Sequence, residues 1–136
     1  MKAFGCAEST RIAGIASVEG TPVGSCTPKR PIPAMHIHGR ADQTVPYDGG
    51  QSLIAWVLGT QFRSVPVGFG GIVTAMGCQP ESTSETSGTV TTEDWNACPV
   101  GVKARLVSIK GMGHEWPTGE PYDATAEILQ FMGISD

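Results

Sequence analysis

Two side chains in glycine-containing turns, Asp42 and His114, are of the types that cooperate in acid–base chemistry. Asp42 ends the stretch "GRAD" after one apolar run, and His114 lies in "GMGHEWP" after another. A carboxylate that accepts a hydrogen bond from the Nδ1–H of an imidazole fixes the ring tautomer and stabilises the imidazolium formed in catalysis. The Nε2 atom of that ring can then take a proton from a serine hydroxyl. This pattern predicts Asp42 as the acid and His114 as the base of a hydrolase.

The elements that must position these two side chains are buried strands alternating with helices. Apolar runs and helical spacing predict strands at about 11–19, 33–38 and 102–109 and helices at about 49–59 and 123–132. This alternation is typical of an α/β fold with a parallel sheet that is covered on both faces. Loops that follow the carboxyl ends of parallel strands gather at one edge of the sheet. We therefore expect Asp42 and His114 to face each other across that edge.

Length and charge limit the classes of protein that remain. The 136 residues are enough for one domain, 1–136, within which the polar, Ser/Thr-rich segment 77–98 is expected to be a surface insertion loop. The formal net charge is −4, and the nine Lys and Arg residues form no cluster. This composition argues against a nucleic-acid partner and against an anionic membrane surface.

Four cysteines, Cys6, Cys26, Cys78 and Cys98, are widely spaced and contain no Cys-x-x-Cys motif. Four thiols allow three pairings. The sequential pairing, Cys6–Cys26 and Cys78–Cys98, closes two short loops and is preferred here. The even number of cysteines and the low lysine content favour a protein secreted to an oxidising, extracellular environment. The alternative is a cytosolic core with four reduced cysteines.

Several stretches together carry a family resemblance. "PIPAMHIHGRADQTVPYDGG", the later "GC…W..C" and "GMGHEWP" resemble the C-terminal half of secreted esterases grouped with feruloyl esterases and polyhydroxybutyrate depolymerases, often assigned to carbohydrate esterase family 1. The resemblance implies an α/β-hydrolase fold without a metal or organic cofactor, in which Asp42 and His114 are the triad acid and base. It also agrees with a Cys78–Cys98 disulfide next to Trp95.

The chain departs from that family at the nucleophile. The family carries its serine in a Gly-x-Ser-x-Gly elbow between a strand and a helix, and no such motif occurs here. Ser17, inside an expected strand, and Ser25, in a Pro-rich turn, do not occupy such an elbow. We therefore expect the nucleophile to lie before Met1, and the chain to be a partial α/β-hydrolase domain.

Two interpretations of the function follow from this departure. In the first, the complete protein is a carboxylic ester hydrolase for feruloyl or acetyl esters on plant polysaccharide, or alternatively for a short-chain polyhydroxyalkanoate such as polyhydroxybutyrate. In the second, the chain is a non-catalytic truncated fragment that binds or self-associates. The exposed sheet edge along "RIAGIASVEG" would be the surface for self-association.

Four further side chains near the two turns could take part in binding. His36 and His38 form His-x-His on a strand and share one face, so a two-histidine metal site is conceivable. No carboxylate is arranged as an obvious third ligand, and we expect His38 to pack before the turn that carries Asp42. Tyr47 and Trp116 flank the two turns. They are expected to line an acyl or aryl pocket for the substrate, with ordinary packing under a loop as the alternative.

Overall fold

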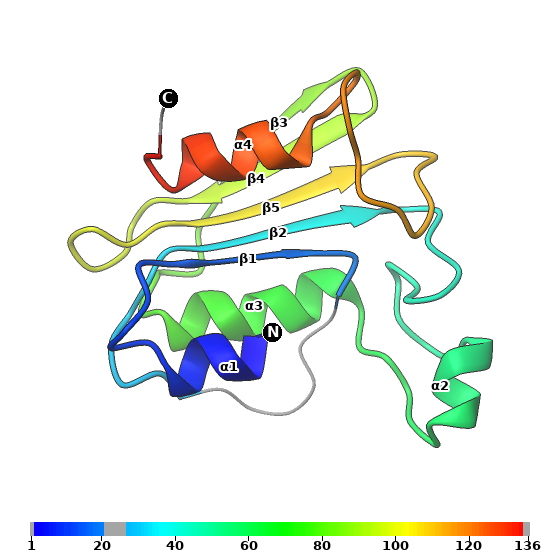
Figure 1. Cartoon of the computed structure of the whole chain (residues 1–136), viewed down its shortest axis with the longest axis horizontal. Helices are drawn as coiled ribbons and strands as arrows, with labels where there is room; N and C mark the ends of the chain where they lie inside the picture. The colour runs from blue at the N-terminus through cyan, green and yellow to red at the C-terminus, as the bar shows by residue number, and fades with distance from the viewer. Residues whose placement is uncertain (1, 21–26, 135–136) are drawn as a thin grey trace.

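The computed structural model describes residues 2–20 and 27–134, which form one sheet and short helices (Figure 1). The strands are β1 (Ile15–Val18), β2 (Ala34–Gly39), β3 (Thr83–Ser87), β4 (Val90–Trp95) and β5 (Ala104–Ile109). The helices are α1 (Lys2–Ala7), α2 (Leu53–Val57), α3 (Val65–Ala75) and α4 (Ala124–Phe131).

The sheet has the strand order β1-β2-β5-β4-β3 and is mixed. β2 pairs in parallel with β1 and with β5, so these three strands have their carboxyl ends at one edge. β4 pairs antiparallel with β5 and with β3. The predicted α/β fold with a parallel sheet, and with it the partial α/β-hydrolase architecture, is therefore wrong for this chain.

The segment responsible for this difference is 77–98, which was expected to be a long disulfide-tied surface loop. It contains β3 and β4, joined by a two-residue turn in which Gly88 has a φ of 60°. Every residue of β3 is exposed, and β4 buries only its two ends, Val90 and Trp95. The hydropathy of this segment therefore resembles that of a loop. Its threonines favour a strand, and β4 forms one by pairing with the edge of β5.

Helices cover both faces of the sheet (Figure 1). α1 and α3 lie on one face and α4 lies on the other, whereas α2 lies away from the sheet. Alternation along β2 directs Ala34, His36 and His38 to the α3 face, and Met35 and Ile37 to the α4 face. None of the helices in the described ranges has both the length and the hydropathy that a membrane span requires.

Side-chain caps define where the two longer helices begin. Ser64 caps α3 by accepting a hydrogen bond from the Val67 N–H, and Asp123 caps α4 by accepting one from the Ala126 N–H. The sequence predicted α4 well. It predicted α2 as a longer helix and did not predict α3, whose three glycines weaken the helical pattern. Burial of Phe69 and its neighbours against the sheet stabilises α3 instead.

The structure contains the predicted disulfide between Cys78 and Cys98. It connects the residues after α3 to the residues after β4, and Trp95 packs beside it with its Nε1–H donating to the Pro80 carbonyl (3.2 Å). Cys6 is buried in α1. Cys26 lies outside the described residues, so the Cys6–Cys26 pairing stays a prediction.

Candidate active site

The loops after β2 and β5 lie side by side at the carboxyl edge of the sheet. The Ala41 N–H donates a hydrogen bond to the Met112 carbonyl (2.9 Å), and the Arg40 N–H donates one to the Ile109 carbonyl (2.9 Å). A Cβ atom at Gly39 would collide with the backbone of Met112, so only glycine allows this approach. The close contact between the two loops fixes where the side chains after them can reach.

Asp42 is held in place by hydrogen bonds to both of its carboxylate oxygens. Oδ1 accepts from the Thr44 N–H (2.8 Å) and the Val45 N–H (2.9 Å), and Oδ2 accepts from His114 Nδ1 (2.8 Å). Burial by itself would raise the pKa of Asp42. Hydrogen bonds from Glu19, Val45, His114 and Thr44 outweigh that effect and hold the pKa below its usual value. Asp42 is therefore ionised at neutral pH.

His114 is hydrogen-bonded to Asp42 through Nδ1, and its Nε2 atom points away from Asp42. Its side chain is 44% exposed, and within residues 2–20 and 27–134 its Nε2 atom has no hydrogen-bond partner. A cavity of about 270 Å³ is lined by Val18, Glu19, His114, Glu115 and Trp116. An imidazole that is oriented through Nδ1, with a free Nε2 beside a cavity, is the arrangement that a general base requires. The expected contact between Asp42 and His114 is thus present, while their catalytic role stays a prediction.

His36 and His38 form a buried chain of hydrogen bonds. His38 Nε2 lies 2.8 Å from the Val45 carbonyl, which can only accept, so this nitrogen carries a proton. In a neutral ring, Nδ1 of His38 then accepts from His36 Nε2 (3.0 Å), and His36 Nδ1 accepts from the Ser17 hydroxyl (3.0 Å). All four ring nitrogens are therefore used, and the pair supports the acid loop rather than offering lone pairs to a metal.

The position of Ser17 does not suit a nucleophile. Ser17 is 6% exposed and its hydroxyl faces the fully buried His36, so an ester carbonyl has no route to it. Ser25 lies outside the described residues.

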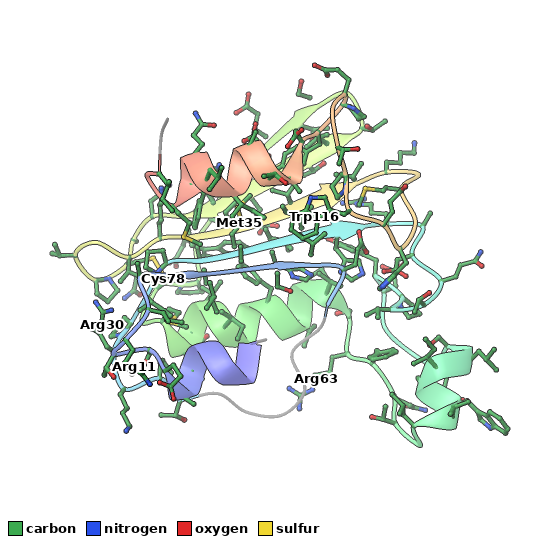
Figure 2. The ribbon with its side chains drawn as sticks, in the orientation of Figure 1. Arg11, Arg30, Met35, Arg63, Cys78 and Trp116 are labelled. Atoms are coloured by element: carbon green, nitrogen blue, oxygen red, sulfur yellow. A yellow bond between two sulfur atoms is a disulfide. The ribbon has the colours of Figure 1, made fainter. Side chains whose placement is uncertain are left out.

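The two aromatic side chains expected near the site differ in position. Trp116 is 52% exposed and lines the cavity beside His114, near the carboxyl ends of β2 and β5 (Figure 2). It also lines a second cavity of about 420 Å³, together with Met112 and Tyr122. The Tyr47 ring packs against His38 (6.0 Å between ring centroids) and under the Arg40 guanidinium. Tyr47 lines neither of these cavities.

Glu19 also belongs to the site, although its sequence context did not predict this. It follows β1, has a φ of 56°, and is 4% exposed. Its Oε1 atom accepts a hydrogen bond from the Gly39 N–H (2.7 Å), and its Oε2 atom lies 3.4 Å from His38 Nε2. Burial, and then a hydrogen bond with Asp42, raise the pKa of Glu19 to about 9. The only signal in the sequence was an acid placed between an apolar run and Gly20.

Glu19, His38 and Asp42 each place one donor atom within 4.8 Å of the others, which is a spacing compatible with a metal ion. The proton on His38 Nε2 argues against this use, because a metal ligand must offer a lone pair there. The donor set is better described as a hydrogen-bonded cluster of two acids and one histidine.

The chain is similar in sequence to a known esterase. Feruloyl esterase B of Piromyces equi is 33% identical to this chain over 91 residues, which are 67% of this chain and 17% of that protein. No protein-family model matches the chain. The chain thus spans less than a fifth of the length of this curated relative, and the relationship it shows is to an esterase.

Proposed function

We propose that this chain carries the acid and the base of a serine-type carboxylic ester hydrolase that acts on feruloyl or acetyl esters of plant polysaccharide. The observation that carries the proposal is the 2.8 Å hydrogen bond between buried Asp42 and His114 Nδ1. The half-exposed His114 side chain also lines a cavity. The esterase relative supports the reaction, and its name supports the feruloyl class of ester.

In the proposed reaction, His114 Nε2 takes the proton from a serine hydroxyl as the serine oxygen bonds to the ester carbonyl carbon. The tetrahedral intermediate collapses when the C–O bond to the alcohol breaks and His114 returns the proton to the leaving oxygen. His114 Nε2 then takes a proton from water as the water oxygen bonds to the acyl carbon. The bond from that carbon to the serine oxygen breaks, His114 returns the proton to the serine, and the acid is released. Asp42 stays ionised throughout and stabilises the imidazolium.

The nucleophilic serine is proposed to come from another segment of the protein. The 136 residues contain no Gly-x-Ser-x-Gly elbow, and the buried Ser17 is bonded to His36. Treatment of the chain with a fluorophosphonate, followed by intact-mass measurement, tests this point. We expect no adduct, and a stoichiometric adduct on any of these residues would overturn it.

Trp116 is proposed as the contact for the aromatic acyl group, because its exposed ring borders the cavity beside His114. The protein is proposed to act outside the cell, since the Cys78–Cys98 disulfide requires an oxidising environment to form and persist. No metal or organic cofactor has a part in this reaction.

The acid–base role is tested by exchanging segments. This chain replaces the matching segment of feruloyl esterase B, so that Asp42, His114 and Trp116 all come from this chain, and the chimera is assayed on methyl ferulate. We expect the chimera to hydrolyse the ester and His114→Gln to lower kcat by about 10³-fold or more. The control Glu85→Gln, on the fully exposed strand β3, should leave kcat unchanged. A chimera that unfolds cooperatively yet hydrolyses no ester, or one that is indifferent to His114→Gln, would count against the proposal.

A further inference from the structure

Glu19 and Asp42 are two buried carboxyl groups at one site. Glu19 follows the edge strand β1, and Asp42 follows the neighbouring strand β2. Both residues are 4% exposed, and one oxygen of each lies within 4.8 Å of the other. Two carboxylates so close together in a buried site do not readily carry a negative charge at the same time. We therefore expect one of the two carboxyl groups to stay protonated while the other is ionised.

The hydrogen-bond donors around the pair decide which acid is ionised. Asp42 receives two backbone N–H groups and the Nδ1–H of His114, which favour its charged form. Within residues 2–20 and 27–134, Glu19 accepts one hydrogen bond, from the Gly39 N–H at Oε1, and His38 Nε2 lies farther from Glu19 Oε2 (3.4 Å) than from Asp42 Oδ2 (3.2 Å). The Oε2 atom of Glu19 is buried without a hydrogen-bond donor in the described part of the chain. An oxygen in that position is satisfied if it carries a proton and donates it to the neighbouring carboxylate.

The backbone of Glu19 adopts an uncommon conformation that places its carboxyl group beside Asp42. A φ of 56° is in the left-handed region, which is uncommon for residues other than glycine and costs free energy. The turn directs the carboxyl group under the loop that carries Asp42 rather than into solvent. Such strain persists when surrounding contacts hold the residue, and here the 2.7 Å bond from the Gly39 N–H does so.

On the basis of the proposed function, we propose that Glu19 is a positioning residue: its neutral carboxyl group donates a hydrogen bond from Oε2 to Asp42 and holds that carboxylate toward His114. In this role Glu19 acts on Asp42 rather than on the serine or the ester, so its effect on catalysis passes through Asp42. The hydrogen-bonded chain at the site then runs from Glu19 to Asp42 to His114.

The groups that face Glu19 come from both neighbouring loops and from β2. They are His38 on β2, Asp42 in the loop after it, and His114 and Glu115 in the loop after β5. Burial and the two acids, Asp42 and Glu115, raise the pKa of Glu19 to about 9, against the lowering effect of the Gly39 N–H. Glu19 therefore stays protonated over the neutral range, which agrees with the role of a donor.

The first test is the titration of the Glu19 side-chain carboxyl carbon by NMR, in the chain labelled with ¹³C-glutamate. Glu19→Gln removes this signal and so assigns it. We expect the signal to keep the shift of a protonated acid through pH 7 and to titrate near pH 9. A Glu19 that titrates near 4.5 would carry a negative charge at neutral pH and would overturn the inference.

The second test compares Glu19→Ala, which removes the hydrogen-bond donor to Asp42, with Glu19→Gln, which keeps a neutral donor. The readout is the rate at which the His114 Nδ1–H proton exchanges with water, in the chain labelled with ¹⁵N-histidine. Glu19→Ala should raise this rate about tenfold, the change expected when one hydrogen bond to a charged group is lost. Glu19→Gln, whose amide can both donate to Asp42 and accept from Gly39, should keep the rate within about threefold of the wild type.

The control for charge alone is Glu115→Gln, which removes a nearby negative charge and leaves the Glu19–Asp42 bond in place. We expect no change in the exchange rate for this variant. Equal exchange in Glu19→Ala and the wild type, or equal acceleration in Glu19→Gln and Glu19→Ala, would overturn the inference. Should Glu19→Ala fail to fold, the carboxyl titration and Glu19→Gln still decide the question.

Neither readout requires ester hydrolysis. A failed esterase assay would therefore leave both tests of Glu19 standing. A Glu19 that proves ionised at neutral pH would remove its role as a donor, while the proposed roles of Asp42 and His114 would remain.

Discussion

Gly39 lies directly against the backbone of Met112, at the place where the loop that carries Asp42 meets the loop that carries His114. The contact leaves no room for a Cβ atom, and it sets the distance between the acid and the base of the candidate site.

Gly39→Ala is therefore expected to destabilise the protein and to separate the two loops. Because the Cβ atom would meet carbonyl groups rather than a flexible side chain, the loss in unfolding free energy should be about 2 kcal/mol or more. Gly113→Ala, in the same loop with open space at its Cβ position, is the matched control and should change stability little. Urea denaturation of both variants measures the difference, and equal midpoints would contradict the prediction.

Asp42→Asn is expected to lower kcat for ester hydrolysis by about 10³- to 10⁴-fold, with a much smaller effect on KM. An amide at this position no longer stabilises the imidazolium and can stabilise the wrong tautomer of His114. Steady-state kinetics on methyl ferulate in the segment-exchange chimera measure the effect. A variant that keeps more than about a tenth of the wild-type kcat would argue against the acid role of Asp42.

Trp116→Ala is expected to act on binding of the aromatic acyl group, because the exposed ring borders the cavity beside His114. In the same chimera, KM for methyl ferulate should rise about tenfold, while kinetic constants for a short acetyl ester should change by less than about threefold. Tyr47→Phe, whose ring packs on His38 and Arg40, is the comparison variant and should alter neither substrate. Equal losses on both esters would indicate that Trp116 only supports the loop.

The stability of the protein should depend on pH through Glu19. The pKa of this acid rises from 4.5 to about 9 on folding, so its contribution to stability is fully present below pH 4.5 and is lost as pH rises toward 9. From pH 4.5 to pH 7, the unfolding free energy of the wild type should fall relative to that of Glu19→Gln by on the order of 3 kcal/mol. Urea denaturation at both pH values measures it, and parallel pH profiles of the two proteins would contradict it.

The isolated chain is expected to self-associate. β1 is an edge strand of the sheet, and α2 exposes Leu53, Trp56 and Val57, each more than two-thirds exposed. Sedimentation velocity over a range of concentrations measures the association. Val18→Pro tests the strand edge and Trp56→Ser tests the helix, and the variant that restores a monomer identifies the surface. A wild type that stays monomeric at all concentrations would contradict the prediction.

Parts of the fold could be predicted because the pattern was local. The apolar runs before Gly39 and Lys110 marked β2 and β5, and the capping Asp123 marked the start of α4. The hairpin of β3 and β4 could not be predicted in this way, because almost all of its side chains face solvent and hydropathy carries no signal there. α3 was not predicted because its three glycines disfavour a helix in the local sequence. Its helix is stabilised by burial of Phe69 against the sheet, which is a tertiary contact.

The sequence by itself determined the chemical types at the site and their positions after two strands, as well as the cysteines of the Cys78–Cys98 disulfide. Only the tertiary structure decided that Asp42 Oδ2 and His114 Nδ1 lie 2.8 Å apart, and that Trp116 rather than Tyr47 borders the cavity. It also decided that Glu19 lies buried beside Asp42. The physical reason is that hydrogen-bond distance, burial and a shifted pKa depend on groups brought together from three strands, whereas residue type and periodicity are properties of one segment at a time.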